Sequence, residues 1–314
     1  MKAYLDIVKD VLAYGQWKEN RTGIRTKALP NMHFTHNFGG ADGTLYNDYP
    51  LLTTKKVAFK TMCVELEGFI NGVTDKKWYQ ERGCKIWNEW ANPQAVQERM
   101  ETELRNNGVI YEPSSIVQQE HLRRQTKESD LGPIYGYQWR KFGEQYGNRS
   151  GGSNGLSCGF DQLKCIVDTL KENPNDRRLV CSAWNPNQLH LQALPPCHLL
   201  FVITTIGDTI NLHWTQRSCD LMLGVPFNIA SYGLLLCLLA AGSGLKPGNL
   251  SGMLCDCHIY ENQLAVADEQ IGRTPRRLPE VVIVESDIFK WTHKDVHLGK
   301  YNHYDTLDFG PVAI

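Results

Sequence analysis

The sequence lacks an excess of charge of either sign, a leader segment and a long apolar run. It has 33 lysines and arginines against 34 aspartates and glutamates, a formal net charge of −1, which argues against an extended nucleic-acid-binding surface. Residues 1–5 lead directly into a helical pattern instead of a signal peptide. The richest apolar stretch, residues 232–241, is too short to span a bilayer. We therefore expect a cytoplasmic protein (in the host cytoplasm if the source is viral) with no membrane or DNA partner.

Internal repeats, low-complexity tracts and paired cysteine motifs are also missing. The ten cysteines are scattered, so reduced thiols are a better interpretation than a disulfide framework. Cys255, Cys257 and His258 lie close together but offer only three candidate metal ligands. Two small buried thiols on a strand before a helix are the simpler interpretation, and we expect no metal.

The pattern of apolar residues predicts both helices and strands in a chain of 314 residues that is 42% hydrophobic. Helical spacing predicts helices over residues 4–14, 61–71, 160–172, 227–241 and 258–270. Strands are predicted over residues 179–184, 199–206, 209–215 and 281–284, with a hairpin turn at Gly207-Asp208. This mixture indicates an α+β fold: a single large domain, residues 1–314, with a mixed or antiparallel β-sheet packed against long buried helices.

One stretch differs in character from the rest of the chain. Residues 92–130 are charged, rich in glutamine and poor in large apolar groups. We interpret residues 93–129 as a variable surface insertion and not as an independent domain. It is predicted to be part amphipathic helix, around residues 95–106, and part loop.

Cys197 is the strongest candidate for a nucleophile. Pro195 and Pro196 fix the backbone before it, His198 follows it, and a strand is predicted to begin next. A thiolate at such a strand edge requires cationic neighbours that lower its pKa, and several arginines are available. The alternative for a lone cysteine is a small buried hydrophobe.

Arginines occur where a small anion could bind. Arg177 and Arg178 lie between a helix breaker and an apolar strand, Arg217 precedes Ser218, and Arg21 lies in its own polar loop. Guanidinium groups and a serine hydroxyl suit a phosphate monoester. Asp220 and Asn228 add hydrogen-bonding groups, although sequence spacing does not show that all these side chains converge.

A series of sequence runs resembles the thymidylate synthase family, in the family's order and over most of the chain outside the insertion. The runs are Arg21-Thr22-Gly23, Pro50-Leu51-Leu52-Thr53-Thr54-Lys55, Ile86-Trp87, Asp130-Leu131-Gly132-Pro133-Ile134-Tyr135-Gly136, Asp176-Arg177-Arg178, Ala193-Leu194-Pro195-Pro196-Cys197-His198, Gln216-Arg217-Ser218-Cys219-Asp220, Gly224-Val225-Pro226-Phe227-Asn228-Ile229-Ala230-Ser231-Tyr232 and His258-Ile259-Tyr260. The run that contains Cys197 and the run that begins at Gly224 are the most specific.

The resemblance implies an enzyme that methylates dUMP at C5 to give dTMP, with 5,10-methylenetetrahydrofolate as donor of the carbon unit and of hydride. Cys197 would add to C6 of the uracil ring. Glu65 would organise water and proton transfers. Asn228 would recognise the uracil edge, because its amide both donates and accepts hydrogen bonds. The implied catalytic residues are Cys197, Glu65, Tyr135, Asp220, Asn228, Trp87 and His198.

The resemblance also implies binding residues and a homodimer. Arg177 and Arg178 would reach the phosphate of the partner subunit's nucleotide. The implied dUMP-binding residues are Arg21, Arg177, Arg178, Arg217, Ser218, Asp220, Asn228, His258 and Tyr260, the last two at the 3′-hydroxyl. The implied folate-binding residues are Lys55, Trp87, Trp90, Asp220, Gly224 and Ala313. Residues 311–314 would close over the site as a lid.

Three departures from the family pattern bear on the product. Glu67 and Gly68 stand where the family usually has a Leu-Trp pair, and Gly68 shares a helix face with Glu65. We expect this change to leave room for an extra water molecule. Asn88 replaces the usual aspartate, and Tyr301-Asn302-His303-Tyr304-Asp305 replaces the usual Pro-His-Pro.

An extra water favours an alternative function, a dUMP hydroxymethylase in which water instead of hydride completes the reaction and 5-hydroxymethyl-dUMP is the product. Trp87 and the C-terminal Val-Ala-Ile favour the synthase, because they would shield the intermediate from water. A third hypothesis is an inactive relative that binds a nucleotide or RNA as a regulator. It requires a lesion among the catalytic residues, but Cys197, Glu65 and Asn228 are all present.

Overall fold

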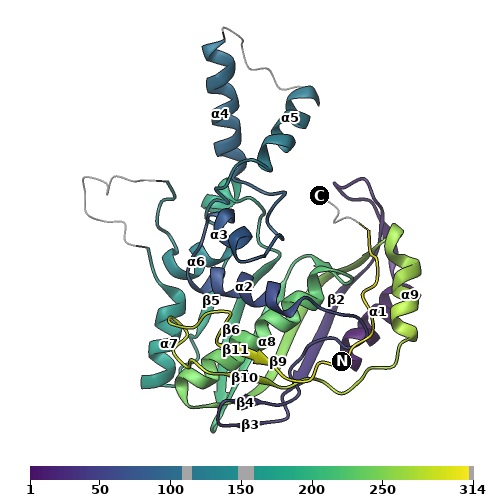
Figure 1. Cartoon of the computed structure of the whole chain (residues 1–314), viewed down its shortest axis with the longest axis vertical. Coiled ribbons are helices and arrows are strands. Elements are labelled where there is room, and N and C mark those ends of the chain that lie inside the picture. The colour runs from purple at the N-terminus through teal and green to yellow at the C-terminus, as the bar shows by residue number, and fades with distance from the viewer. Residues whose placement is uncertain (108–114, 148–158, 311–314) are drawn as a thin grey trace. The chain divides into compact units, whose positions relative to one another are not determined.

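The computed structural model describes residues 1–107, 115–147 and 159–310 (Figure 1). The chain forms two compact units that interleave along the sequence. The first unit comprises Met1–Cys63, Ile166–Val180 and Cys197–Ile314, and the second comprises Val64–Cys165 and Cys181–Pro196.

The main sheet is mixed and has the strand order β1-β2-β9-β7-β6-β5, with β8 paired to β9; all of its strands except most of β5 belong to the first unit. The strands are β1 (Gln16–Lys18), β2 (Thr26–Asn37), β5 (Val180–Ser182), β6 (His198–Ile206), β7 (Thr209–Gln216), β8 (Cys219–Asp220) and β9 (Lys246–Tyr260). β2 pairs antiparallel with β9 and β6 with β7, whereas β7 and β8 run parallel to β9. The predicted α+β fold with a mixed sheet is confirmed, as is the hairpin at Gly207, which has a φ of 63°.

Helix α8 (Gly224–Ser243) forms the centre of this unit, and residues 234–240 within it are all buried. It confirms the helix predicted over residues 227–241 and extends it by three residues at its start and two at its end. By length and composition alone α8 is apolar enough to cross a membrane, but 72% of its most apolar window is buried inside the structure. It is therefore the core helix of a folded unit.

Two further helices and a small sheet complete the first unit. Helix α1 (Lys2–Tyr14) carries Tyr4, whose hydroxyl donates to the Leu221 carbonyl at 2.7 Å. Helix α9 (Leu264–Gly272) follows β9. The small sheet has the order β11 (Val296–Leu298), β10 (Val281–Ile283), β4 (Leu45–Tyr46) and β3 (Ala41–Asp42).

The predicted helix over residues 258–270 is wrong in its first part. Residues 258–260 end strand β9, a short 3-10 turn (Glu261–Gln263) follows, and only then does α9 begin. His258 pairs with Ala28 of β2 and with Asp220 of β8. These partners are far away in sequence, so non-local pairing overrides the local helical pattern.

The second unit is mainly helical. Helix α2 (Phe59–Ile70) enters it from the first unit, and α7 (Gln162–Glu172) leaves it. Between them lie α3 (Lys76–Glu81), α4 (Pro93–Asn106), α5 (Ser115–Gln125) and α6 (Tyr135–Lys141), and a 3-10 helix (Pro186–Leu191) returns to it later. Gly72, with a φ of 67°, follows the end of α2, which confirms the helix predicted over residues 61–71.

The insertion contains two helices, not one. α4 confirms the predicted helix, but α5 lies where a loop was predicted. Arg124 of α5 pairs with Glu103 of α4 at 2.6 Å and with Glu120 at 2.7 Å. A small apolar cluster joins the two helices and is made of Ala91, Val96, Met100 and Val117. Because α5 is polar on nearly every side, its sequence carries no apolar period that would predict a helix.

Candidate active site

Cys197 immediately precedes strand β6, as the sequence predicts. Its carbonyl accepts the backbone N–H of Arg217 at 2.8 Å, and the next residue, His198, pairs with Gln216 of β7. The ladder shifts register between His198 and Leu200, a local irregularity of the kind that redirects side chains at a sheet edge. The sheet thus fixes the backbone of Cys197 and ties it to the Arg217 segment.

Asp220 and Asn228 are oriented by specific hydrogen bonds. The Asp220 carboxylate accepts the backbone N–H groups of Met222 at 2.9 Å and Leu223 at 3.1 Å. Burial raises the pKa of Asp220, against those backbone donors and the nearby His258 and Lys55. The Asn228 side-chain oxygen accepts from Gln216 Nε2 at 3.0 Å, and the same nitrogen donates to the Ser218 carbonyl at 3.0 Å. Both polar groups are therefore held in place before any ligand binds.

His258 and Tyr260 lie at the end of strand β9. Their rings meet edge to face, with the ring centres 5.4 Å apart. His258 Nδ1 lies 3.0 Å from the Asp256 carbonyl oxygen. Burial and the Asp220 charge raise the pKa of Tyr260, Arg21 lowers it, and Cys197 raises it further. These electrostatic effects indicate that several predicted residues gather in one neighbourhood. We call Cys197, Asp220, Asn228, His258 and Tyr260 the sheet set.

His198 faces the core. It is buried, its Nδ1 lies 2.7 Å from the Tyr232 hydroxyl of α8, and the two rings meet edge to face. Burial lowers the pKa of His198 to about 3, so its ring is neutral at physiological pH. The structure thus gives His198 a packing role beside the candidate nucleophile, and its inclusion among the catalytic residues stays a prediction.

Lys55 is buried, and its ammonium donates to the Met222 carbonyl and lies 4.2 Å from the centre of the Phe309 ring. Burial lowers the pKa of Lys55 to about 7, and Asp220 opposes that shift. Gly224 lies at the start of α8, where a Cβ atom would be 3.8 Å from the Asn228 side-chain oxygen and 3.9 Å from Asp220 Cβ. Lys55 and Gly224 therefore lie beside the sheet set, while Ala313 and the predicted lid lie outside the described residues.

Tyr301, in the segment that departs from the family's Pro-His-Pro, braces the chain around Lys55. Its hydroxyl lies 2.5 Å from the Leu52 carbonyl oxygen and accepts the backbone N–H of Val57 at 3.0 Å. The altered segment thus retains a structural function in the first unit.

The predicted phosphate ligands fall into two groups. Arg217 and Ser218 are half-buried between β7 and β8, and Arg21 lies in the exposed turn before β2. Arg177 and Arg178 are exposed just before β5, and Arg178, 88% exposed, pairs with Asp176 at 2.7 Å. The predicted phosphate role of this second group requires a second subunit.

The second unit holds Glu65, Trp87 and Tyr135 among aromatic rings. Phe69 lies one turn after Glu65, and its ring centre is 4.9 Å from that of Tyr135 and 6.4 Å from that of Trp87. Burial raises the pKa of Glu65 to about 7, and the Trp87 side chain opposes that shift. Sequence reasoning missed Phe69 at the centre, although its position four residues after Glu65 indicates a shared helix face. We call Glu65, Phe69, Trp87 and Tyr135 the aromatic set.

The indole N–H of Trp87 is directed toward Glu65. Among the described residues, this buried nitrogen has no acceptor with good hydrogen-bond geometry, but as a loose donor to the Glu65 carboxyl it lowers the pKa of that group. A buried donor without an acceptor is costly. It is therefore available to a carboxylate that moves slightly or to a bound ligand.

The expectation that Gly68 leaves room for water is wrong. A Cβ atom at this position would lie 2.3 Å from Cε1 of Tyr79 and 2.4 Å from its hydroxyl oxygen. Tyr79 is 0% exposed and donates to the Val73 carbonyl at 3.3 Å. The Tyr79 ring thus fills the space that a larger residue would occupy, and the flank of Glu65 beside Gly68 is closed.

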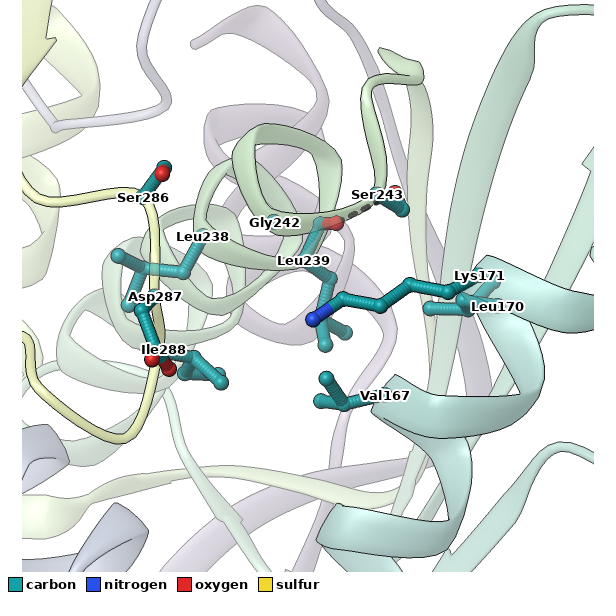
Figure 2. Close-up of a pocket in the computed structure, with 10 residues that line it drawn as sticks. All are labelled: Val167, Leu170, Lys171, Leu238, Leu239, Gly242, Ser243, Ser286, Asp287 and Ile288. Carbon is teal, nitrogen blue, oxygen red and sulfur yellow. Dashed lines mark hydrogen bonds between the residues drawn. The ribbon is translucent and has the colours of Figure 1, made fainter.

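The hollow beside α8 in the first unit is too small to be a second site. It is lined mainly by apolar side chains, among them Val167, Leu238 and Leu239, and Lys171 extends across it (Figure 2). Its volume of about 10 Å³ corresponds to a single water molecule at most.

Comparison with known proteins agrees with this geometry. A family model described as thymidylate synthase matches residues 2–313. The thymidylate synthase of Mycoplasma genitalium is 39% identical over 315 residues and covers 100% of each chain. That of varicella-zoster virus (strain Dumas) is 39% identical over 97% of this chain and 91% of its own. The bifunctional dihydrofolate reductase-thymidylate synthase of Leishmania amazonensis is 38% identical over 92% of this chain and 50% of its own.

The fold, the two sets of side chains and these matches define an enzyme of the methyltransferase class. The chain belongs to the thymidylate synthase family.

Proposed function

We propose that the protein methylates dUMP at C5 to give dTMP, with 5,10-methylenetetrahydrofolate supplying the carbon unit and the hydride. The observation that carries this proposal is the family match over residues 2–313, within which Cys197, Glu65 and Asn228 are all present. The hydroxymethylase alternative is not favoured, because the full-length relatives are named thymidylate synthases and Tyr79 fills the space beside Gly68.

Cys197 begins the reaction in this proposal. Its sulfur forms a bond to C6 of the uracil ring, and the electron pair of the C5–C6 double bond moves toward C5 and O4. C5 then forms a bond to the carbon unit. Loss of the C5 proton then breaks the bond between that carbon and the folate nitrogen, which leaves an exocyclic methylene on C5 and free tetrahydrofolate. Hydride transfer from tetrahydrofolate to this methylene expels the Cys197 thiolate and restores the C5–C6 double bond, so the products are dTMP and dihydrofolate. The fixed backbone of Cys197, bonded to Arg217 at 2.8 Å, supports an attack that needs little reorganisation.

Asn228 selects uracil by its amide, which donates to a ring oxygen and accepts from a ring N–H. The hydrogen bond from Gln216 Nε2 at 3.0 Å supports this role, because it favours one orientation of the amide. His258 and Tyr260, edge to face on β9, supply polar groups for the 3′-hydroxyl. Asp220, held by two backbone N–H groups, supplies a fixed acceptor next to them.

Glu65 performs the proton transfers. A carboxyl with a pKa of about 7 is half protonated at neutral pH, so it can either donate or accept a proton. The rings of Trp87 and Tyr135, packed around Phe69, limit the access of water to this part of the site. The aromatic set thereby favours addition of hydride over addition of water in the last step of the reaction.

The phosphate would be held by Arg21, Arg217 and Ser218, together with Arg177 and Arg178 of a second subunit in a homodimer. The exposure of the latter two arginines supports their availability to another chain. Lys55, Trp87, Trp90, Asp220 and Gly224 would bind the folate, and the indole N–H of Trp87 fits a polar ligand atom. We place this activity in the cytoplasm.

The experiment that tests the proposal is a product analysis. The protein is incubated with dUMP and methylenetetrahydrofolate, and nucleotides and folates are separated by chromatography with mass detection. Formation of dTMP with an equal amount of dihydrofolate supports the synthase. Formation of 5-hydroxymethyl-dUMP with tetrahydrofolate would establish the hydroxymethylase instead, and no nucleotide product would refute both.

A further inference from the structure

Lys76, the first residue of α3 in the second unit, is a buried lysine that belongs to neither set of candidate catalytic side chains. The residue is 2% exposed. Its ammonium donates to the carbonyl oxygens of Gln125 at 2.6 Å, Trp90 at 3.0 Å and Asn88 at 3.1 Å. An ammonium has three donors, and here each one meets a backbone acceptor.

The three acceptors come from two separate parts of the second unit. Asn88 and Trp90 belong to the tryptophan turn, residues 87–90, which is closed by a hydrogen bond from Trp90 N to the Trp87 carbonyl at 3.1 Å. Gln125 is the last residue of α5 in the insertion, so its carbonyl is one of the groups that a helix end leaves without an internal partner. Lys76 thus joins the tryptophan turn to the end of the insertion.

The backbone around Lys76 strengthens this junction. The Lys76 N–H donates to the Ser129 carbonyl at 2.8 Å, and the Asn92 N–H donates to the Asp130 carbonyl at 2.7 Å. Asn92 also begins α4, where its side chain accepts from Gln94 N at 3.1 Å. The hydrogen bond to Ser129 therefore anchors the end of the insertion to Lys76, and the hydrogen bond between Asn92 and Asp130 ties the start of the insertion to the same place.

Burial of the Lys76 ammonium is electrostatically unfavourable unless other groups compensate for it. Burial lowers the pKa of Lys76, and the carboxylates of Glu89, Glu128 and Asp75 oppose the shift. A buried ammonium is tolerated only where acceptors replace its hydration. Removing it would leave three carbonyls without their donor, and the turn would lose the group that fixes two of its four carbonyls.

We propose that Lys76 is a positioning residue that holds the tryptophan turn against the end of the insertion and so fixes the Trp87 and Trp90 rings for folate. This inference rests on the proposed function, since it assumes that these indoles contact the folate. It also gives the insertion a role in the reaction, because the Gln125 carbonyl at the end of α5 accepts the third hydrogen bond of the Lys76 ammonium.

The test compares three variants with the wild-type protein. Lys76→Met removes the ammonium but keeps a long side chain, Lys76→Arg keeps the charge, and Lys77→Met is the matched control, because the adjacent Lys77 is exposed. Steady-state kinetics give kcat and the KM for dUMP and for methylenetetrahydrofolate. Quenching of tryptophan emission by tetrahydrofolate gives a binding constant that does not depend on turnover.

We expect Lys76→Met to raise the folate KM and the tetrahydrofolate Kd about tenfold while the dUMP KM changes by less than about twofold. Lys76→Arg should fold and show a smaller rise of about threefold, because a planar guanidinium fits three converging carbonyls less well. Lys77→Met should resemble the wild type.

Two results would overturn the inference: folate values for Lys76→Met or Lys76→Arg that equal those of Lys77→Met, or an equal rise in the dUMP and folate constants. Should Lys76→Met not fold, Lys76→Arg carries the test. Failure of the proposed function is distinguishable, because the wild type would then form no dTMP, while the tetrahydrofolate titration would still compare the variants.

Discussion

The sheet set and the aromatic set hold their functional groups in different ways. In the sheet set, Asp220 is fixed by two backbone N–H groups and Asn228 by Gln216, so hydrogen bonds define where each polar atom points. In the aromatic set, the rings of Trp87 and Tyr135 pack on Phe69, one turn after Glu65, and burial raises the pKa of the Glu65 carboxyl to about 7. Hydrogen bonds suit recognition of a polar substrate, whereas apolar packing suits tuning of a proton donor.

The difference has an energetic consequence. A polar group with satisfied partners can be kept at little net cost, but a carboxyl kept in an apolar environment destabilises the folded protein once it must ionise. Glu65 in the aromatic set should therefore reduce stability more than Asp220 in the sheet set, because two backbone N–H groups oppose the upward pKa shift of Asp220. The predictions below test this contrast, from the largest expected effect to the smallest.

Removal of Cys197, the proposed nucleophile in the sheet set, should have the largest effect. Cys197→Ala is expected to lower kcat by at least about 10⁴-fold, because no covalent adduct can form. The Kd for dUMP, measured by calorimetry, should change by less than about threefold, since the fixed polar groups remain. The control Cys165→Ala removes an exposed thiol and should be fully active. Appreciable turnover by Cys197→Ala would refute the nucleophile assignment.

Removal of the ionisable group from the aromatic set should have the next largest effect. Glu65→Gln should lower kcat about 10²- to 10⁴-fold and abolish the limb of the kcat–pH profile near pH 7. A limb near pH 7 that persists in the variant would assign that titration to another group.

The same substitution tests the energetic contrast. In the wild type, the pKa of Glu65 rises from 4.5 to about 7 on folding. The contribution of Glu65 to stability is therefore most favourable below pH 4.5, is lost as the pH rises from 4.5 to about 7, and changes no further above that. Urea denaturation should show Glu65→Gln more stable than the wild type at pH 8 by about 1–2 kcal/mol, a value discounted for the partial exposure of this residue. The difference should disappear near pH 4.5, and an equal difference at both values would contradict the account.

A change in the recognition group should alter specificity more than stability. Asn228→Asp is expected to shift preference from dUMP toward dCMP, by about 10- to 100-fold in the ratio of kcat/KM values, because a carboxylate accepts but does not donate. Competition between the two nucleotides measures this ratio. An unchanged ratio would count against Asn228 as the uracil-recognising residue.

The smallest effect concerns packing beside Glu65. Gly68→Ala places a Cβ atom 2.3 Å from Tyr79 and should destabilise the protein by about 1–3 kcal/mol. Gly272→Ala is the matched control, because nothing lies within 4 Å of a Cβ atom there, and its stability should be unchanged or slightly increased. Equal thermal midpoints for the two variants would show that Tyr79 moves aside freely.

What the sequence predicts depends on whether the signal is local. The helix around Glu65, the hairpin at Gly207 and the position of Cys197 before β6 follow from periodicity and turn residues, and all three are found in the structure. Strand β9 was missed at His258 because its partners, Ala28 and Asp220, are far away in sequence. The few residues on either side of His258 therefore carry no signal for this pairing.

The aromatic set illustrates a second kind of limit. Sequence spacing correctly places Gly68 on the Glu65 face of a helix, yet the ring that fills the space comes from Tyr79, on the next helix. Similarly, α5 has no apolar stripe of its own, and its Arg124 pairs with Glu103 of α4. In both cases the deciding partner belongs to another element, so the sequence of one element alone does not reveal it.

The most direct test of the central claim, that Cys197 activates the uracil ring, is exchange of the C5 proton. Addition of the sulfur to C6 makes C5 basic, so a protein that forms the adduct should exchange the C5 hydrogen of dUMP for deuterium in D₂O without any folate. Proton NMR of the nucleotide follows this reaction. We predict exchange with the wild type and none above background with Cys197→Ala. Exchange at the wild-type rate in Cys197→Ala would contradict the account.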